Sequence, residues 1–248
     1  MADNTIGTIA EIWRYPVQSM AGETLSTTEL TPAGVHGDRA WGLVDREVKA
    51  IVSSSQGKRK WRDIVTLGAR YLRPPPSYGP ASPVEIITPS GKTMRSDEPD
   101  IDRQLSAFLG GDAHLADKET EQPRTEYGYE PVHLLTTGSL QAFAAHHPQG
   151  QFAPARFRPN IVVDTGGAWG FIEQTWVGRR LRIGEAVEIA VTDNCKRCVM
   201  TTLAQGDLPL DPAILHTVTA HNKANAGVYA TVARPGSIRV GDPIRVVG

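Results

Sequence analysis

The chain has 248 residues, of which 40% are hydrophobic and 21% charged, and its formal net charge is −1 at pH 7. These values are ordinary for a globular protein with one large domain or two smaller ones. Because the charge is close to zero, no overall field attracts nucleic acid or an anionic membrane, and we expect neither as a partner.

The expected cellular location follows from three features of the sequence. The N-terminus has no basic segment followed by an apolar run, so we expect no signal peptide. No stretch approaches the ~20 apolar residues of a membrane helix. Two cysteines are too few for a disulfide scaffold. We therefore expect a protein of a reducing compartment, most simply the cytoplasm.

Short β-branched runs, bounded by glycine and proline, recur along the chain and predict strands. Their spacing is typical of barrels or sandwiches. In chain order these runs are 6–13, 40–45, 84–88, 160–164, 187–191, 227–232 and 238–247.

Helix signals are fewer. Residues 100–110 begin with an aspartate cap and end at glycine. Residues 136–148 begin with a threonine cap and stop before Pro148, and residues 211–222 carry a proline in the first turn. The fold class is therefore predicted to be mainly β with a few short helices.

Two stretches lack strand and helix patterns. The proline-rich segment 73–83 is predicted to be a loop, because proline cannot continue a strand or a helix. Residues 110–131 are polar and weakly patterned, which makes them the best candidate for a boundary. We predict two domains, residues 1–112 and 113–248.

Both cysteines lie in the segment DNCKRCVMTTL, residues 193–203. Cys195 and Cys198, followed by His216 and His221, have the order of a zinc finger. The intervening residues 199–215 exceed the usual spacing of roughly 12–15, and they contain glycine and prolines. A zinc site is therefore disfavoured, although the spacing does not exclude it.

Three other interpretations of the cysteine pair remain. A thioredoxin-like pair precedes a helix, but β-branched residues follow Cys198. Two buried cysteines without a chemical role are a second possibility, which the polar neighbours oppose. The third is one thiolate ligand for a redox metal, because the adjacent Lys196 and Arg197 favour the ionised thiol. Spacing alone does not choose among them.

Several segments together resemble the MOSC family, the molybdenum cofactor sulfurase C-terminal superfamily. The similarity is to the branch with the mitochondrial amidoxime-reducing component and its bacterial relatives, and it covers nearly the whole chain. The segments are IAEIWRYPVQSMAGETL (9–25), GVHGDRAWGLVD (34–45), RKWRDIVTLGARY (59–71), EPVHLLTTGSL (130–140), RFRPNIVVD (156–164), WVGRRLRIG (176–184), NCKRC (194–198) and 227–247. The resemblance implies an N-terminal β-barrel domain followed by a MOSC β-barrel domain.

The resemblance also implies a molybdenum cofactor, in which a molybdopterin holds the metal and a protein cysteine completes its coordination. Cys198, the second cysteine of the motif, is then the metal ligand and the catalytic residue. The implied cofactor-binding residues are Gln18, Ser19, Arg39, Thr136, Thr137, Arg158, Asn160, Lys196 and Arg197. Guanidinium groups and hydroxyls of this kind bind phosphate oxygens. Gln18 departs from the family, which usually has lysine at that position.

By resemblance, the activity is reduction of N-hydroxylated compounds such as amidoximes, hydroxylamines or N-hydroxylated bases. The chain has no further cysteines for an iron–sulfur cluster and no G-x-G-x-x-G fingerprint. Electrons are therefore expected from a separate ferredoxin or flavoprotein. Two alternatives stay open: a metal-free sulfur carrier or sulfurtransferase with a Cys198 persulfide, and a module that carries molybdopterin without turnover.

Overall fold

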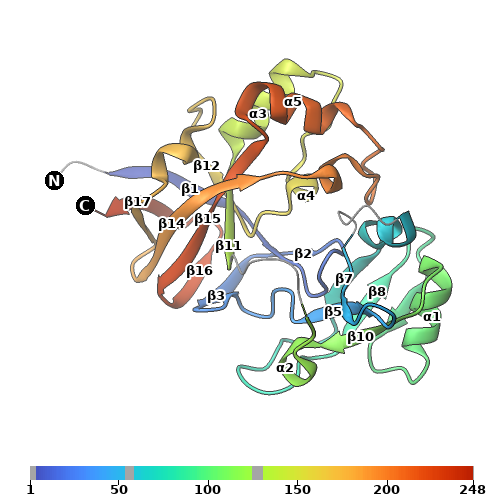
Figure 1. Ribbon diagram of the computed structural model, residues 1–248. Helices are drawn as coiled ribbons and strands as arrows, with labels where there is room; N and C mark the ends of the chain where they lie inside the picture. Colours follow the sequence, from blue (N-terminus) through green and yellow to red (C-terminus); the bar gives the residue numbers. More distant parts are fainter. Residues whose placement is uncertain (1–3, 54–58, 125–130, 248) are drawn as a thin grey trace.

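The computed structural model describes residues 4–53, 59–124 and 131–247. Figure 1 shows two parts side by side: a larger part built on a barrel and covered by helices, and a smaller part of short strands with one longer helix. The first and last strands of the chain pair with each other in the larger part. The predicted class, mainly β with a few short helices, is confirmed.

Seven strands close the barrel of the larger part. Their order is β12-β11-β15-β14-β13-β17-β1, and β1 pairs back with β12. Neighbouring strands are antiparallel except β11 and β12, which are parallel, and β2 pairs with the far end of β1. The bounds are β1 (Thr5–Arg14), β2 (Glu23–Leu25), β11 (Val132–Thr136), β12 (Ile161–Asp164), β13 (Arg180–Ile183), β14 (Val187–Lys196), β15 (Asn225–Arg234) and β17 (Pro243–Val247).

Apolar side chains fill the interior of the barrel. Successive side chains of a strand point to opposite faces, so the inward face of each strand can be apolar. Ile12, Leu134 and Val228, from three different strands, are completely buried in this core. Burying one side chain of this size contributes about 1.5–3 kcal/mol. The predicted run 160–164 forms β12 and the run 227–232 lies within β15.

A short sheet also packs against the barrel. Its strand order is β16-β3-β4, and Leu30, Val35 and Ile238 belong to the barrel core. The strands are β3 (Thr27–Thr31), β4 (Gly34–Val35) and β16 (Gly236–Arg239).

Two further sheets form the smaller part, in the orders β10-β5-β6 and β7-β8-β9. They enclose a second core, in which Trp61, Leu67 and Ile86 are buried. The indole nitrogen of Trp61 donates to Oδ2 of Asp45 at 3.1 Å, so its polar atom has a partner. The strands are β5 (Trp41–Asp45), β6 (Ala50–Ile51), β7 (Gly68–Tyr71), β8 (Val84–Ile87), β9 (Thr93–Arg95) and β10 (Ala113–Asp117).

Strand pairing runs across the boundary that the sequence predicts. β1 belongs to a barrel whose other strands all follow residue 131, and β10 pairs with β5 although it begins at residue 113. The polar stretch 110–131 contains β10 and a short helix, and its residues 125–130 lie outside the described part. The assignment of residues 1–112 and 113–248 to separate domains stays a prediction.

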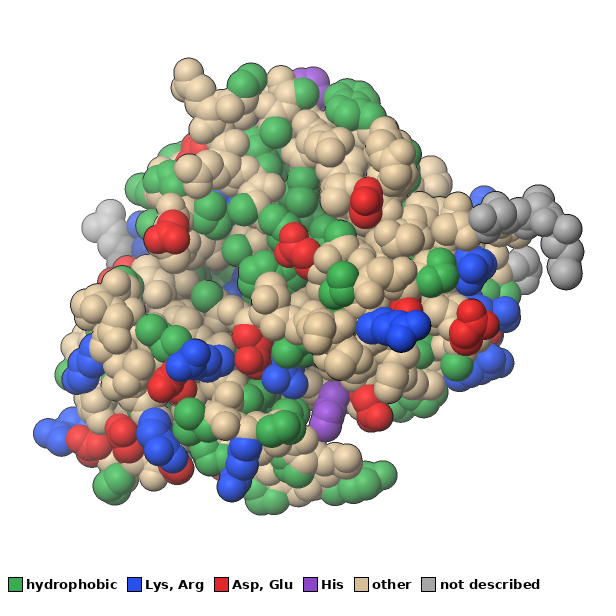
Figure 2. All heavy atoms as spheres, turned by 180° about the vertical axis from the view of Figure 1, so that it is seen from behind, with side chains coloured by type: hydrophobic (Ala, Val, Ile, Leu, Met, Phe, Trp, Pro, Cys, Tyr) green, Lys and Arg blue, Asp and Glu red, His purple; other side chains and the backbone are tan. Residues whose placement is uncertain are grey.

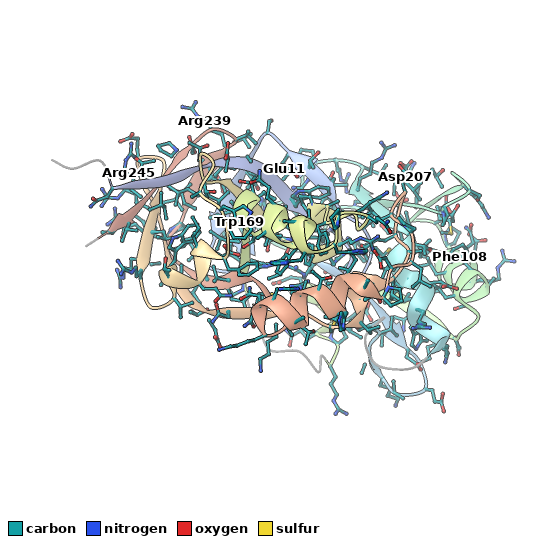
Figure 3. The ribbon with its side chains drawn as sticks, turned by 90° about the horizontal axis from the view of Figure 1, so that it is seen from above. Glu11, Phe108, Trp169, Asp207, Arg239 and Arg245 are labelled. Atoms are coloured by element: carbon teal, nitrogen blue, oxygen red, sulfur yellow. The ribbon has the colours of Figure 1, made fainter. Side chains whose placement is uncertain are left out.

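The three predicted helices are present. α1 (Ile101–Leu109) ends at Gly110, whose φ of 69° is left-handed and therefore suits glycine. α3 (Thr137–His146) and α5 (Ala213–Asn222) lie side by side over the barrel (Figure 3), and they bury Phe143 and Val218. The shorter helices are α2 (Lys118–Glu121), α4 (Pro154–Phe157) and the 3-10 helices η1 (Arg59–Thr66), η2 (Ile172–Trp176) and η3 (Val199–Thr202).

Two further expectations concern loops and location. Residues 72–83 contain neither helix nor strand, as their proline content predicts. Among the described residues, no helix has the length and apolar character needed to cross a bilayer. The cytoplasmic location stays a prediction. On the face shown in Figure 2, acidic and basic side chains are interspersed, without a large patch of one sign.

Candidate functional site

A cleft of about 1090 Å³ lies between the barrel and the smaller part. Six of the ten residues that the resemblance implies line this cleft, namely Gln18, Ser19, Arg39, Arg158, Arg197 and Cys198. The cleft is also lined by Asp38, Tyr71, Lys118, Glu119, His133, Met200 and Tyr229. Four of these side chains are cationic and two are acidic, so the lining attracts anions.

Cys198 lies in the short connection between β14 and η3. It has an extended backbone with φ −123°, and η3 starts at the next residue, Val199. The side chain is exposed and the thiol is free. A free thiol at the wall of a cation-rich cleft can bind a soft metal or react as a nucleophile.

Cys195 has a different environment from Cys198. It is completely buried in β14, and its Sγ accepts a hydrogen bond from Nη1 of Arg197 at 2.6 Å. Burial by itself raises the pKa of this thiol, but the charge of Arg197 and the interactions with His133 and Tyr229 together outweigh that effect, and the pKa falls to about 6. The two cysteines therefore form neither a disulfide nor an equivalent pair.

The zinc-finger interpretation finds no ligand set in the structure. His216 and His221 lie on α5, which covers the barrel. Nowhere in residues 4–53, 59–124 and 131–247 do three or more His, Cys, Asp or Glu side chains come together as a metal site. A closed zinc site needs four ligands around one centre.

Arg197 is fixed beside the cleft by two hydrogen bonds. Nη1 donates to Cys195, and Nη2 donates to the carbonyl oxygen of Phe157 at 2.7 Å. Its Nε is buried and has no partner in the described part of the chain. A buried donor without a partner costs free energy, so this nitrogen favours an acceptor in the cleft.

Arg158 is held in a similar way. It ends α4 in the left-handed conformation, with φ 54°, and its Nη1 donates to the carbonyl of Met20. The guanidinium carbon lies 4.2 Å from the ring centroid of Tyr15. Burial lowers the pKa of Arg158 to about 10, so the side chain stays charged at neutral pH. Its Nη2 is a second buried nitrogen without a partner among the described residues.

Arg39 contributes a third guanidinium from the loop before β5. It forms an ion pair with Asp38, and its guanidinium carbon lies 5.5 Å from the ring centroid of Tyr15. Asp38 also accepts from the backbone nitrogen of Tyr15 at 2.7 Å. This pairing leaves Arg39 partly exposed at the cleft.

The loop after β1 supplies Gln18 and Ser19. Ser19 has φ 69°, a left-handed conformation that non-glycine residues adopt rarely, and its Oγ donates to the carbonyl of Val52 at 3.5 Å. Oε1 of Gln18 accepts from Nζ of Lys118 at 2.5 Å. The loop thus brings both side chains to the cleft while its backbone pairs with the smaller part, at Val17 with Trp41 and at Ala21 with Gly68.

The structure places four implied binding residues outside the cleft lining. Thr136 is completely buried, where its hydroxyl caps α3 and donates to Oε2 of Glu173 at 2.7 Å. The hydroxyl of Thr137 is directed to Asp164 at 3.5 Å. Thr136 and Thr137 do not line the cleft, and their role in cofactor binding stays a prediction.

Asn160 and Lys196 are the other two residues outside the lining. Oδ1 of Asn160 accepts from the backbone nitrogen of His133 at 3.1 Å, and Nδ2 donates to the carbonyl of Trp13 at 3.4 Å. These bonds connect β11 with β1. The side chain of Lys196 is exposed outside the cleft.

The comparison with protein families agrees with this arrangement. The MOSC domain matches residues 110–245, which is more than half of the chain, and the MOSC N-terminal beta barrel domain matches residues 6–56. The chain belongs to the MOSC family. The resemblance described from the sequence motifs is thereby confirmed.

Relatives of this MOSC protein include named proteins of mammals. The chain is 27% identical to the mitochondrial amidoxime reducing component 2 of Rattus norvegicus, with 96% of this chain and 83% of the relative covered. It is 24% identical to the mitochondrial amidoxime-reducing component 1 of Homo sapiens, over 98% and 84% of the two chains. Among solved structures, the YUAD protein from Bacillus subtilis has a TM-score of 0.51 at 11% identity, covering 97% and 94%. That likeness concerns the fold.

Sequence analysis missed several residues of the MOSC cleft. Lys118 lies in none of the family segments, whereas Tyr71 and Tyr229 lie within such segments without being identified as site residues. His133 also lies in a family segment and lines the cleft, with its Nε2 3.0 Å from the carbonyl oxygen of Ala226. The sequence held one signal for Lys118. Position 18 is Gln18 where the family usually has lysine, so another cation could be expected nearby.

Proposed function

We propose that this MOSC protein is a molybdenum-dependent oxidoreductase that reduces N-hydroxylated compounds. The observation that carries the proposal is the free, exposed thiol of Cys198 in the wall of a cleft that also contains Arg158 and Arg197. The names of the relatives, amidoxime reducing components, support the reaction class. An acidic cleft around the thiol would not have supported it, because it would repel the anionic cofactor.

The residues of the cleft fit a molybdenum cofactor. A soft thiolate suits the metal, and guanidinium groups suit the phosphate of the pterin. The buried nitrogens without partners, Nη2 of Arg158 and Nε of Arg197, are donors to which a bound anion can supply the missing acceptor. The volume of about 1090 Å³ slightly exceeds the usual range for ligand pockets, roughly 300–1,000 Å³, and so leaves room for a large ligand.

In the proposed site, Cys198 ligates the metal, and Arg39, Arg158 and Arg197 bind the anionic part of the cofactor. Gln18 and Ser19 contribute polar contacts from the loop after β1. When bound, the molybdenum cofactor supplies the two-electron chemistry of the N–O bond. An amidoxime takes up two electrons and two protons and becomes an amidine and water. The protein residues fix the orientation of cofactor and substrate in the cleft.

The electrons are proposed to come from a separate ferredoxin or flavoprotein. The chain holds two cysteines, of which Cys195 is buried and bonded to Arg197, so neither is left to build an iron–sulfur cluster beside a Cys198 that ligates molybdenum. A donor protein must therefore approach the open side of the cleft.

The proposal is tested by metal and pterin analysis of protein from molybdate-fed cells. We expect close to one molybdenum per chain together with fluorescent pterin after release, and loss of both in Cys198→Ser. With reduced methyl viologen as donor, the wild-type protein is expected to convert benzamidoxime to benzamidine. Folded protein without metal and pterin contradicts the proposal. In that case, cyanide-releasable sulfur supports the sulfur-carrier alternative. If the cofactor is bound but benzamidoxime is not reduced, the result supports the carrier module instead.

A further inference from the structure

Lys118 lies at a point where the smaller part of the protein contributes to the cleft. It is the first residue of α2, directly after β10, and its backbone nitrogen donates to the carbonyl of Ala40 at 3.0 Å. Its side chain is partly buried and packs close to Gly42, since a Cβ at residue 42 would lie 3.2 Å from Cε of Lys118. The ammonium group is therefore fixed in place and not free in solvent.

The ammonium group of Lys118 has a neutral partner. Nζ donates to Oε1 of Gln18 at 2.5 Å, and within the described ranges 4–53, 59–124 and 131–247 it forms no ion pair. Asp38 is close enough to act on its charge, but that carboxylate is already paired with Arg39. By contrast, Arg39 is paired with Asp38, and Arg158 lies over the ring of Tyr15.

Burial and the nearby charge of Arg39 make the ammonium form of Lys118 unfavourable. Burial is the larger effect, and together they lower the pKa of Lys118 to about 8. A cation that is desolvated beside another cation and bonded to a neutral amide is stabilised by an anion that enters the cleft. Among the described residues, Lys118 is thus a cation of the cleft that has no ion-pair partner of its own.

We infer that Lys118, oriented by Gln18, binds the anionic phosphate portion of the ligand in the cleft. This inference rests on the proposed function for the identity of the ligand. The family usually places lysine at position 18, and here that position holds the amide that orients a lysine from another segment. In this chain the lysine comes from the start of α2, and its Nζ lies 2.5 Å from Oε1 of Gln18.

The pairing also explains why glutamine suits position 18. A lysine there would place a second ammonium group against Nζ of Lys118, which lies 2.5 Å from the present amide oxygen. Two like charges at such a distance repel each other. Glutamine at 18 and lysine at 118 are therefore expected to act as a unit, so that changing either one alone harms ligand binding.

The test uses three variants of the full chain: Lys118→Gln, Lys118→Arg and the double variant Gln18→Lys with Lys118→Gln. Molybdenum and pterin per chain are measured after gel filtration, together with thermal unfolding. Loss of one charge-assisted hydrogen bond is expected to weaken retention by about tenfold or more in Lys118→Gln. Lys118→Arg should retain most of the cofactor. The double variant, which returns the lysine to the family position, should restore it.

A second measurement separates this inference from the proposed function. Inorganic pyrophosphate is titrated into metal-free wild-type protein and into each variant by calorimetry. Wild-type affinity that is lost in Lys118→Gln and restored in the double variant supports the inference, even if the wild-type protein carries no molybdenum and the proposed function fails. Equal pyrophosphate affinity, or equal cofactor retention, in wild type and Lys118→Gln overturns it. A folded double variant that stays as weak as Lys118→Gln also overturns it.

Discussion

Nη1 of Arg197 donates to Sγ of Cys195 at 2.6 Å, so the buried cysteine of the pair holds the arginine that stands beside the exposed one. The two thiols of the motif therefore have different roles. Cys195 positions a cation, and Cys198 is available to the ligand. The two cysteines, three residues apart in sequence, should respond differently to substitution.

Replacing Cys195 by alanine removes the acceptor of Arg197 and leaves a second nitrogen of this buried guanidinium without a partner. We expect the free energy of unfolding to fall by about 1–3 kcal/mol, measured by urea denaturation. Cys195→Ser keeps an acceptor at the same place and should lose less. Cys195→Ser should also keep most of the cofactor and activity, whereas Cys198→Ser should abolish both with little change in stability. Equal loss of activity from the two serine variants would contradict the single-ligand proposal.

The observed hydrogen bonds of the Thr136 hydroxyl can be tested by substitution. Its hydroxyl accepts from the backbone nitrogen of Ser139 at 3.0 Å and donates to the buried carboxyl of Glu173. Thr136→Ala should lower the free energy of unfolding by about 1–2 kcal/mol, because a helix cap and a buried hydrogen bond are lost together. Cofactor per folded chain should not change. Thr137→Ala is the control, with little effect on either quantity. Cofactor loss in Thr136→Ala at full stability would return this residue to the binding site.

The fold class was predictable because its signals are local. Strand-forming runs such as 160–164 and 227–232 are β-branched and bounded by turn residues, and the helix at 100–110 carries its cap and its terminal glycine within one stretch. Neither signal depends on what the segment packs against. Family motifs then predicted six residues of the cleft lining.

The remaining features of the cleft depend on contacts between distant segments. Gln18 and Lys118 meet only because the loop after β1 and the start of α2 face the same cleft. Which cysteine is buried could not be inferred from alternation, because the register of β14 shifts between Val191 and Asp193 and again between Asn194 and Lys196. Thr136 follows a motif, but the sequence does not show that its hydroxyl is already engaged by α3 and Glu173.

Asp45 links the strands of the smaller part to its core. Its carboxylate accepts from the backbone nitrogen of Glu47 at 2.9 Å, from Nζ of Lys60 at 3.3 Å and from the indole of Trp61. Burial raises the pKa of Asp45, but the hydrogen bonds from the backbone of Glu47 and Val48 and the bond and charge of Lys60 outweigh that effect, and the pKa lies below its ordinary value. The carboxylate therefore stabilises the folded state above the ordinary aspartate pKa, and this contribution is lost as the pH falls through the lower, folded-state pKa.

Asp45→Asn should accordingly lower the free energy of unfolding at pH 7 by about 1–3 kcal/mol, since an amide cannot accept all of these bonds. The difference in the free energy of unfolding between wild type and Asp45→Asn should shrink as the pH is lowered below about 4. Urea denaturation of both proteins from pH 7 to pH 3 measures it. Asp97→Asn, at an exposed ion pair with Arg95, is the matched control and should change stability little. If the difference in the free energy of unfolding between wild type and Asp45→Asn is constant over the whole pH range, the ionised carboxylate of Asp45 does not stabilise the fold.

The pH dependence of anion binding follows from Lys118. In the free protein its pKa is about 8, and a bound anion favours the charged form, so above pH 8 binding requires uptake of a proton. The affinity of metal-free protein for pyrophosphate should therefore decrease as the pH rises from 7 to 9.5, by up to about tenfold per unit above 8. Asp38, Arg39 and Glu119 also line the cleft, and pyrophosphate itself titrates, so the comparison is with Lys118→Arg, whose guanidinium stays charged throughout. The ratio of the two affinities should be constant below pH 8 and fall above it. Parallel curves for wild type and Lys118→Arg would show that the ammonium of Lys118 does not contact the anion.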